Sequence, residues 1–576
     1  MADEYQYSEY DKREARRESK YGHSYKWIAL SNTTLGVMMA TIDSSILIIS
    51  LPAIFNGLGI NPLTPGNITL LLWLLLGYII MSSTVVITIG RLSDMFGRVR
   101  LYNLGFAIFA IGSTLLYVAS YAFKGTTAVE MFIILRLVQG LGGGFLFANS
   151  TAIITDAFPK NQRGTAMGIN QISAIMGSLL GLIIGGVLAT IDWHLIFLIS
   201  VPVGIIGAIW SYVALHEIAE IRKDQKIDIF GNITFALGLT VILLSMTYGL
   251  LPYGNANTGW HNPYVVGGMA LGVSLIIAFI IIELKSKDPM FNLGLFKIKE
   301  FSSGIVSLFL SGIARGGLQF MLIIWLQGIW LPLHGVNFIN TPLQAGIDMT
   351  PLLAGFLLFG PTSGYLSDRY GARRLKIIGM TINVFGFLML AILPVNFAYA
   401  DFAVIIFLLG AGQGMFAAPN TISIMNSVPP QNRGATSGIQ GTLTNASFMF
   451  SMVVFFTILI FGLGATLPKV LYNGLIMQNV PNQTAATVSK LPPTSALFAA
   501  LLGYNPMQTL LSNATSSIPK ANLTVITGTK FFPSLISNSF KSGMRIVMFV
   551  AAAMAAIVAI ISALRKETKI KEAGAQ

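Results

Sequence analysis

Long apolar runs alternate with short polar segments along almost the whole chain. Residues 131–154 (MFIILRLVQGLGGGFLFANSTAII) and 545–564 (RIVMFVAAAMAAIVAIISAL) are two of these runs. A helix needs about 20 apolar residues to cross about 30 Å of hydrocarbon, whereas a membrane β-strand is much shorter. The pattern therefore predicts an all-α integral membrane protein.

Fourteen such runs stand between polar breaks, which predicts fourteen spans with both chain ends on the same side. The first span lacks a small-residue cleavage site, so we expect it to be retained. The expected bounds are 28–50, 68–90, 101–120, 129–151, 166–190, 195–215, 229–251, 263–284, 301–330, 346–366, 376–395, 402–425, 435–463 and 543–564.

Basic residues indicate which loops lie inside. Most of the 36 lysines and arginines fall in alternate loops, beginning with the N-terminal segment. Because cytoplasmic loops carry such an excess, we expect the tails 1–27 and 566–576 to lie in the cytoplasm and the spans to lie in the plasma membrane. The net charge of +13 is then a topology signal and does not indicate a nucleic-acid partner.

Composition narrows the chemistry. The chain is 54% hydrophobic and only 10% charged, and it has no cysteine, which excludes disulfides and thiolate metal sites. Its five histidines are scattered, and no phosphate-binding loop of the ATPase type is present. We therefore expect no enzyme activity, no metal and no cofactor, and transport would draw on a proton gradient.

Three phrases occur twice. GRLSDMFGRVR begins at Gly90 and GYLSDRYGARR at Gly364; FPKNQRGTAMGI begins at Phe158 and VPPQNRGATSGI at Val428. Three glycines around Gly142 return around Gly412. The offsets of 270 to 274 residues span eight helices, so two parallel six-helix halves must be separated by two extra helices. This predicts bundles at 28–216 and 300–565, with an extra pair at 226–286.

These motifs resemble the major facilitator superfamily, and within it the fourteen-span drug:proton antiporters. GRLSDMFGRVR resembles the signature between spans 2 and 3, RLVQGLGGG that of span 4, and GSLLGLIIGG that of span 5. ATIDSSILIISLP and TPLQAGIDMTPLLAG resemble motifs of spans 1 and 10. Leu182 stands where the span-5 signature has proline. The resemblance implies efflux of hydrophobic or amphipathic compounds.

Asp43 and Arg136 are the favoured proton-coupling residues. Each lies about eight residues from the outer end of its span, which places both roughly 12 Å inside the boundary. An arginine favours the ionised form of a neighbouring carboxylate and burial disfavours it, so a conformational change can load and release a proton. The resemblance also links the span-4 arginine to proton coupling. The alternative is a static ion pair.

The repeat shows which residues of the first half have a counterpart in the second half and which do not. Arg136 corresponds to Ile406 in the second half, so the pair is not duplicated, whereas Asp43 corresponds to Arg315. Arg315 is interpreted as an anion-binding group, a charge partner of Asp43 or a structural residue. The tentative substrate-cavity residues are Gln139, Asn170, Gln171, Arg315, Gln319 and Trp325; Gln413 is a further polar residue on a cavity span.

Two further groups of residues are assigned roles in helix packing and in gating. We interpret the span-5 glycines as allowing close helix approach, and the repeated phrase as a gate between the halves or, alternatively, a topological anchor. The packing glycines are Gly177, Gly181, Gly185 and Gly186. The gate residues are Gly90, Asp94, Gly97, Arg98, Gly364, Asp368 and Gly371.

The segment 464–542 is expected to be an extracytoplasmic loop. It contains SALFAALLGY, which is too short to span and is interpreted as an interfacial helix. Sequons that would be glycosylated if exposed stand at Asn67, Asn482, Asn513 and Asn522.

Proton-driven drug efflux is therefore the favoured function, with small molecules, protons and the bilayer as partners and a monomer as a sufficient unit. Alternatives are a major facilitator transporter of one metabolite, sugar or organic ion, and a membrane receptor that transports nothing.

Overall fold

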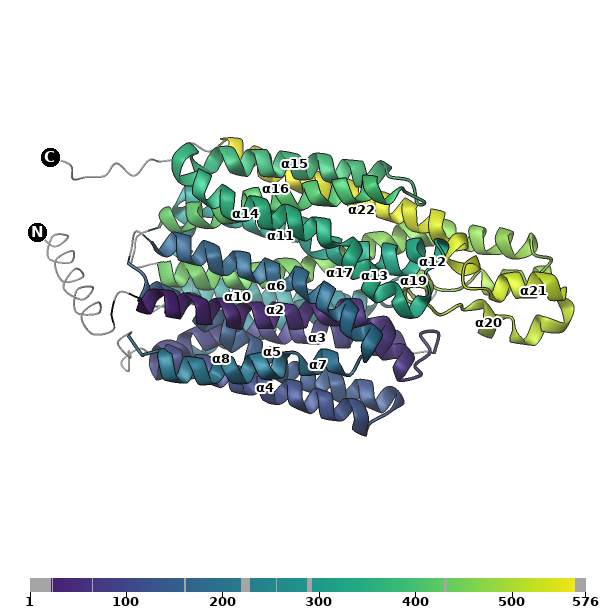
Figure 1. Ribbon diagram of the computed structural model, residues 1–576, viewed down its shortest axis with the longest axis horizontal. Helices are drawn as coiled ribbons and strands as arrows, with labels where there is room; N and C mark the ends of the chain where they lie inside the picture. The colour runs from purple at the N-terminus through teal and green to yellow at the C-terminus, as the bar shows by residue number, and fades with distance from the viewer. Residues whose placement is uncertain are drawn as a thin grey trace, which may run out of the picture.

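The computed structural model is built from helices that run roughly along one axis (Figure 1). It describes residues 22, 24–64, 66–159, 162–218, 228–254, 256–286, 293–428 and 433–564. Both predicted tails lie outside these residues except for residues 22 and 24–27 at the start of the chain. In the described ranges the only β-type pairing is an isolated bridge between Tyr253 and Ala256.

Fourteen helices in the described ranges are long and apolar enough to cross a membrane, which confirms the predicted number. Three of these spans are interrupted and are built from consecutive helical segments. In chain order the spanning elements are α2 (Tyr25–Gly57), α3 (Asn67–Phe96), α4 (Arg98–Ala122), α5 (Gly125–Ala157), α6 (Arg163–Ile191), α7 (Leu195–Leu198) with α8 (Ser200–Ala214), α9 (Ile229–Gly249), α10 (Pro263–Lys285), α11 (Lys299–Trp325) with η2 (Leu326–Trp330) and α12 (Leu331–Leu333), α13 (Thr341–Asp348) with α14 (Thr350–Tyr370), α15 (Ala372–Ile392), α16 (Tyr399–Asn426), α17 (Arg433–Ile476) and α22 (Phe531–Leu564).

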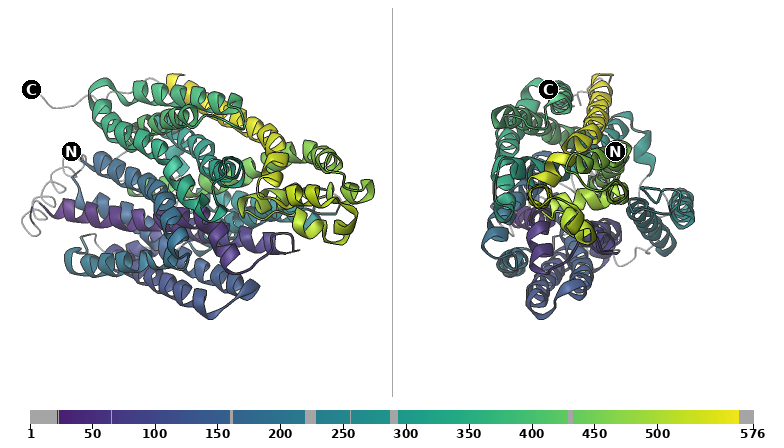
Figure 2. Two further views of the ribbon diagram at one scale, coloured as in Figure 1. Left: turned by 45° about the vertical axis from the view of Figure 1, so that its right-hand side comes forward. Right: turned by 90° about the vertical axis from the view of Figure 1, so that its right-hand side faces the viewer.

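The spans form two bundles. In the first, α2 packs on α6, and α5 packs on α3 and α4; in the second, α16 packs on α14 and α15, and α17 on α11 and α22. The extra pair, α9 and α10, pack on each other at the side of the molecule, and α9 packs against α3 (Figure 2). This is the 6+2+6 arrangement that the repeat offset predicts.

The bundles meet along two seams. On one, α6 contacts α13, α14 and α16; on the other, α17 contacts α3 and α5. At the first seam Gly186 lies so close to the backbone that an added Cβ would sit 2.5 Å from the carbonyl oxygen of Pro342. A glycine is therefore required where the two bundles touch.

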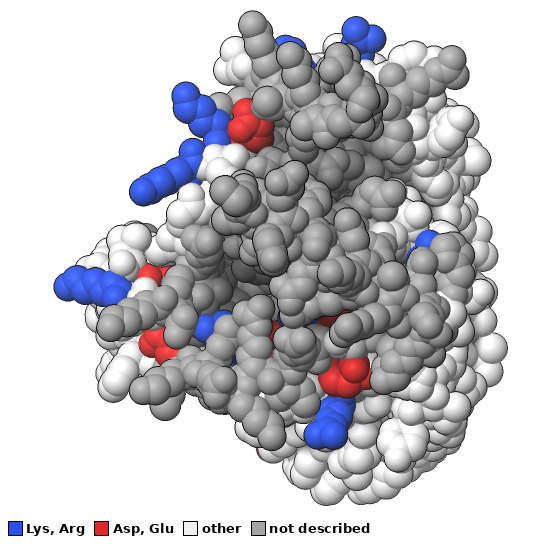
Figure 3. All heavy atoms as spheres, turned by 90° about the vertical axis from the view of Figure 1, so that its left-hand side faces the viewer, with Lys and Arg blue, Asp and Glu red and all other residues white. Residues whose placement is uncertain are grey.

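The start of α2 and the end of α22 lie at the same end of the molecule, which we call the terminal face (Figure 1). Lysine, arginine and acidic side chains of the described residues gather on this face (Figure 3). The other end, the opposite face, carries the segment between α17 and α22, which extends beyond the ends of the other helices.

Several predicted bounds are wrong near the opposite face. Helix α17 continues to Ile476 and α22 begins at Phe531, so both enter the segment expected to be a loop. The span predicted over 346–366 begins at Phe338 and is broken at Met349, next to Pro351, which has no N–H to donate. Apolar periodicity does not report such extensions, because a helix covered by protein outside the membrane is also apolar.

The segment between α17 and α22 folds as a small helical insert. It contains α18 (Asn482–Val488), α19 (Pro493–Leu501), α20 (Met507–Leu510), η5 (Ser512–Ser517) and α21 (Lys520–Thr527). Every residue of α19 is buried, and α19 contacts η2, α17 and α22. The predicted interfacial helix is therefore wrong: an interfacial helix keeps one face in water, whereas α19 is enclosed by protein.

Candidate transport site

An ion pair between Asp43 and Arg136 lies at the centre of the first bundle. Asp43 is on α2 and Arg136 on α5, and Nη1 of Arg136 donates to Oδ2 of Asp43. Both residues are 1% exposed. The structure thus brings together the two residues that the sequence placed at one depth.

Neutral polar side chains complete this polar cluster. Gln139 accepts a hydrogen bond from Nη1 of Arg136 at 2.6 Å and donates to Oδ1 of Asp43 at 2.8 Å. It also donates to Ser113 at 2.8 Å, and Ser200 donates to Oδ1 of Asp43 at 3.3 Å. Four helices, α2, α4, α5 and α8, therefore contribute to one buried network, and a change in any of their positions alters the surroundings of the carboxylate.

Tyr78 of α3 adds an aromatic face to the cluster. The guanidinium carbon of Arg136 lies 4.6 Å from the centre of the Tyr78 ring, a cation–π distance, and the Tyr78 hydroxyl donates to the Ala40 carbonyl at 3.1 Å. Sequence reasoning missed Tyr78, Ser113 and Ser200, because single polar residues in apolar runs give no signal of which way they face.

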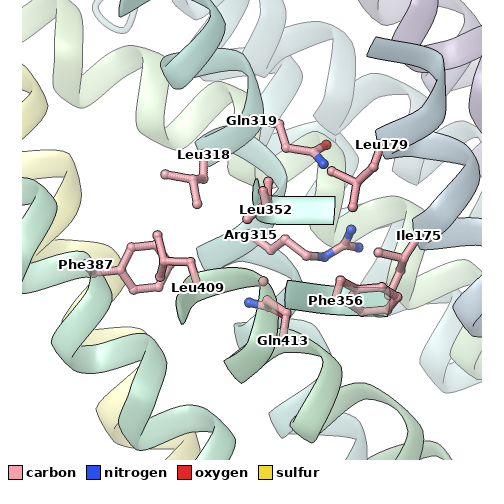
Figure 4. Close-up of a pocket in the computed structure, with 11 residues that line it drawn as sticks. Ile175, Leu179, Arg315, Leu318, Gln319, Leu352, Phe356, Phe387, Leu409 and Gln413 are labelled. Carbon is pink, nitrogen blue, oxygen red and sulfur yellow. The ribbon is translucent and has the colours of Figure 1, made fainter. Parts of the chain in front are cut away.

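A cavity lies between the bundles, largely within the second one. It is small, with a volume of about 20 Å³. Its polar lining residues are Arg315, Gln319 and Gln413, and the other side chains are apolar, with Phe356 among them (Figure 4). Helix α6 of the first bundle closes one side with Ile175 and Leu179.

Arg315 extends into this cavity from α11 (Figure 4). Among the residues that the structure describes, no carboxylate lies within 4.0 Å of it and none donates to or accepts from it. Of the three interpretations of Arg315, the one as charge partner of Asp43 is contradicted in this conformation, because the partners of Asp43 are Arg136, Gln139 and Ser200.

The other tentative cavity residues divide into two groups. Gln319 lines the cavity and accepts from Ser178 of α6 at 3.1 Å, across the seam between the bundles. Gln139, Asn170, Gln171 and Trp325 are not among the residues that line it.

Trp325 and Asn170 are held by other contacts. Trp325 is buried in an aromatic cluster, with its ring 5.2 Å from that of Phe397. Asn170 accepts from Ser150 at 3.1 Å. Both residues are polar or amphipathic, which is why the sequence suggested a cavity role, but neither lines the cavity in this conformation.

The first copy of the repeated phrase forms a charged network on the terminal side of the first bundle. Arg98 donates to Asp94 at 2.7 Å and to Asp156 of α5 at 2.6 Å. The backbone N–H groups of Arg98 and Val99 donate to the carboxylate of Glu217 at 2.8 and 3.0 Å. A carboxylate at the first turn of α4 stabilises the helix N-terminus.

These contacts of Asp94 and Arg98 all lie within one half. The expected contact of Asp94 with the other half is therefore absent from the described residues in this conformation. In the second copy, Ala372 replaces the arginine and the neighbouring Arg373 donates to the carbonyl of Ala563. The side chain of Asp368 lies outside the described residues.

Only one glycine of each copy forms the turn. Gly97 and Gly371 have φ angles of +106° and +86°, which favour glycine. Gly90 and Gly364, although in the same phrase, lie inside α3 and α14 and form no turn.

The span-5 glycines pack as predicted for a close helix pair. A Cβ at Gly177 or Gly181 would meet the backbone of α2, with the Ile42 carbonyl oxygen 2.5 Å from the one at Gly181. Gly185 faces Ile46 and Ile49 of the same helix. Helices α2 and α6 can approach this closely only because α6 lacks side chains at these positions.

The sequons differ in exposure. Asn482 is exposed, whereas the amide of Asn522 donates to the Gln478 carbonyl at 2.9 Å. Asn67 is 7% exposed and its amide donates to the Asn61 carbonyl at 2.7 Å, so a glycan there would require rearrangement. The side chain of Asn513 lies outside the described residues.

Among the described ranges, no group of three histidine, cysteine or acidic residues could hold a metal ion.

Two helical bundles with a cavity between them, and a buried acid–base cluster within the first bundle, define a membrane transporter of the two-bundle class. The model of the Major Facilitator Superfamily matches residues 33–228 and 227–452. The chain belongs to this family.

Known proteins of the family are similar over most of the chain. The riboflavin transporter RibZ of Clostridioides difficile (strain 630) is 30% identical over 75% of this chain and 87% of its own. The multidrug transporter protein MdtP of Bacillus subtilis (strain 168) is 26% identical over 87% of both chains. The solved structure of the proton:xylose symporter XylE has a TM-score of 0.51 at 15% identity, covering 83% of this chain and 96% of its own, and shows the same fold.

Proposed function

We propose that this transporter exports hydrophobic or amphipathic compounds in exchange for protons. The observation that carries the proposal is the buried cluster of Asp43, Arg136 and Gln139 in the first bundle, together with a mainly apolar cavity between the bundles. The multidrug relatives support the substrate class. The terminal face is the cytoplasmic side of the plasma membrane in this proposal, and a single chain suffices because it contains both bundles.

Asp43 is the proposed proton carrier and Arg136 its modulator. In the conformation described, Arg136, Gln139 and Ser200 stabilise the ionised carboxylate. If α5 shifts relative to α2, Asp43 loses these partners, and a buried carboxylate without a partner takes up a proton. Rocking of one bundle against the other, through the seam of α6 and α13, would then link proton movement to substrate access.

Transport of a single metabolite is the second candidate, favoured by the riboflavin transporter among the relatives. A cavity that releases its substrate by the same alternating access would serve either function, because the fold does not set the substrate. Breadth of substrate range separates the two candidates.

Flux in proteoliposomes tests the proposal. Purified full-length chain is reconstituted, a pH gradient is imposed, and the movement of fluorescent amphipathic dyes of different charge is followed. Wild type should show flux that depends on the gradient, and Asp43→Asn should abolish the dependence. Glu130→Gln is the control, because Glu130 is an exposed carboxylate on the same helix as Arg136. Gradient-driven flux that survives Asp43→Asn would sink the proposed proton site.

A further inference from the structure

Arg315 differs from the other arginine buried in the bundle centres in one respect. Arg136 has a carboxylate, an amide oxygen and an aromatic ring around it. Arg315 has no ion pair or hydrogen bond among the residues that the structure describes. A cation in the membrane interior is costly unless it meets a partner or water, so a retained unpaired arginine indicates that the partner comes from outside the chain.

The groups around Arg315 are donors. Its guanidinium carries five N–H groups and no acceptor. Gln319, one helical turn away on α11, uses its Oε1 to accept from Ser178 at 3.1 Å, which leaves its Nε2 as a donor to the cavity. Gln413 of α16 adds a second amide, and none of the described residues that line the cavity is acidic. This lining offers a negative oxygen several donors and no repulsion.

The apolar lining of the cavity favours a ligand with an apolar skeleton. Leu318, Leu352, Phe356 and Leu409 from the second bundle and Leu179 from the first surround the polar groups (Figure 4). An aromatic or aliphatic skeleton would replace water on these side chains, while its acidic group reached Arg315. The cavity is too small for such a molecule in this conformation, so binding requires that the bundles separate at the seam beside α6.

The geometry points to an amphipathic organic anion, a carboxylate or sulfonate on an apolar skeleton, as the preferred substrate, with Arg315 as its charge contact. This inference rests on the proposed function and names the substrate class of the same site. It also has an energetic consequence. In a one-for-one exchange, a proton entering while an anion leaves moves charge across the membrane, whereas exchange of a proton for a monovalent cation moves none.

A matched set of probes tests this inference. Dansylglycine, dansylamide and dansylcadaverine share one fluorophore and carry a negative, a neutral and a positive group. Binding to the purified full-length chain in detergent is read from fluorescence anisotropy. Wild type should bind the anion most tightly, and Arg315→Gln should weaken that binding on the order of tenfold to a hundredfold, the range expected for hydrogen bonds to a charged group.

Two variants serve as controls. Arg315→Lys keeps the charge and should retain part of the preference for the anion, which excludes misfolding as the cause. Arg545→Gln removes an arginine of α22 that is exposed and lies over Phe549, away from the cavity, and should change nothing. In proteoliposomes, an imposed membrane potential should stimulate flux of dansylglycine and leave that of dansylcadaverine unchanged.

Failure of this inference is distinguishable from failure of the proposed function. Equal binding of the cation and the anion by wild type, or anion binding that survives Arg315→Gln, would overturn the role of Arg315 while proton-driven export could still be observed with dansylamide. Absence of gradient-driven flux for all three probes would overturn the export proposal, and the binding measurement would still decide the preference for an anion.

Discussion

The two halves of this transporter repeat the same helices but treat buried charge differently. In the first half, Arg136 is 1% exposed and bound to Asp43 and Gln139. In the second half, Arg315 points into the cavity with no partner among the described residues. The helices are thus duplicated but the buried charges are not. Arg136 belongs to a charge cluster inside the first half, whereas Arg315 faces the cavity.

Helix packing shows a second asymmetry between the halves. The pair α2 and α6 corresponds by the repeat to α11 and α17. In the first pair the glycines are on α6, and an added Cβ at Gly181 would meet the Ile42 carbonyl oxygen at 2.5 Å. In the second pair the glycines are on α11, and an added Cβ at Gly317 would meet the Ser451 carbonyl oxygen at 2.9 Å. Both pairs therefore approach closely through glycines, but the glycines are on α6 in the first pair and on α11 in the second.

Removal of each buried arginine tests the first asymmetry with the largest effect. Arg136→Ala leaves the carboxylate of Asp43 buried without its partner, and we expect a loss of about 3–5 kcal/mol in the free energy of unfolding. Arg315→Ala removes a charge that has no partner and should leave stability equal or higher. The midpoint of denaturant unfolding in detergent measures both.

The double variant Asp43→Asn/Arg136→Gln is the control for this comparison. It removes both charges together, so its loss should be smaller than that of Arg136→Ala alone. If Arg136→Ala and Arg315→Ala destabilise equally, the distinction between a partnered and an unpartnered arginine fails.

Glycine substitutions test the second asymmetry. Gly181→Ala and Gly317→Ala each place a methyl group against backbone of the neighbouring helix, and overpacking of this kind costs about 1–3 kcal/mol. Gly90→Ala is the matched control inside α3, because its added Cβ would meet nothing within 4 Å. Thermal unfolding in detergent should rank both packing variants below wild type, and Gly90→Ala level with it. A neutral Gly317→Ala would show that only the first half depends on close approach.

The sequence predicted the fold well because membrane spans and repeats can be recognised from short stretches of sequence. The number of spans, the 6+2+6 division and the family all follow from apolar runs and three repeated phrases. The insert was predicted poorly. Its helix α19 is buried by contacts with α17, α22 and η2, and such long-range burial leaves no periodic signal in nine residues.

The site was predicted in part. Asp43 and Arg136 could be paired because charges in apolar runs are rare and the rise of a helix places them at one depth. The helix face of a glutamine could not be determined, and Gln139 and Gln319 therefore appeared equivalent although one binds Asp43 and the other lines the cavity. Single residues such as Tyr78 contribute through tertiary contacts that the chain does not encode locally.

The two copies of the repeated phrase provide a third comparison. Arg98 bridges Asp94 and Asp156, whose side chains are 28% and 19% exposed, so Arg98→Gln should lower the free energy of unfolding by about 1–2 kcal/mol. In the second copy Ala372 stands at the corresponding position, so that copy lacks this bridging arginine. Denaturant titration of Arg98→Gln and wild type in parallel measures the loss. A midpoint equal to that of wild type would show that the bridge adds nothing to stability.

The smallest expected effect concerns the insert, which belongs to the second half but contacts the first. The amide of Asn61, after α2, donates to the hydroxyl of Tyr504 at 3.1 Å, and that hydroxyl is also hydrogen-bonded to Thr509. Tyr504→Phe removes both bonds, and we expect a loss of about 0.5–1.5 kcal/mol. Because the loss is local, hydrogen exchange of residues 482–528 is the sensitive measurement and should speed up while exchange in α5 stays unchanged. Tyr264→Phe is the control, since Tyr264 is 87% exposed. Unchanged exchange in the insert would show that its buried helix α19, and not the bond to Asn61, holds it against the two bundles.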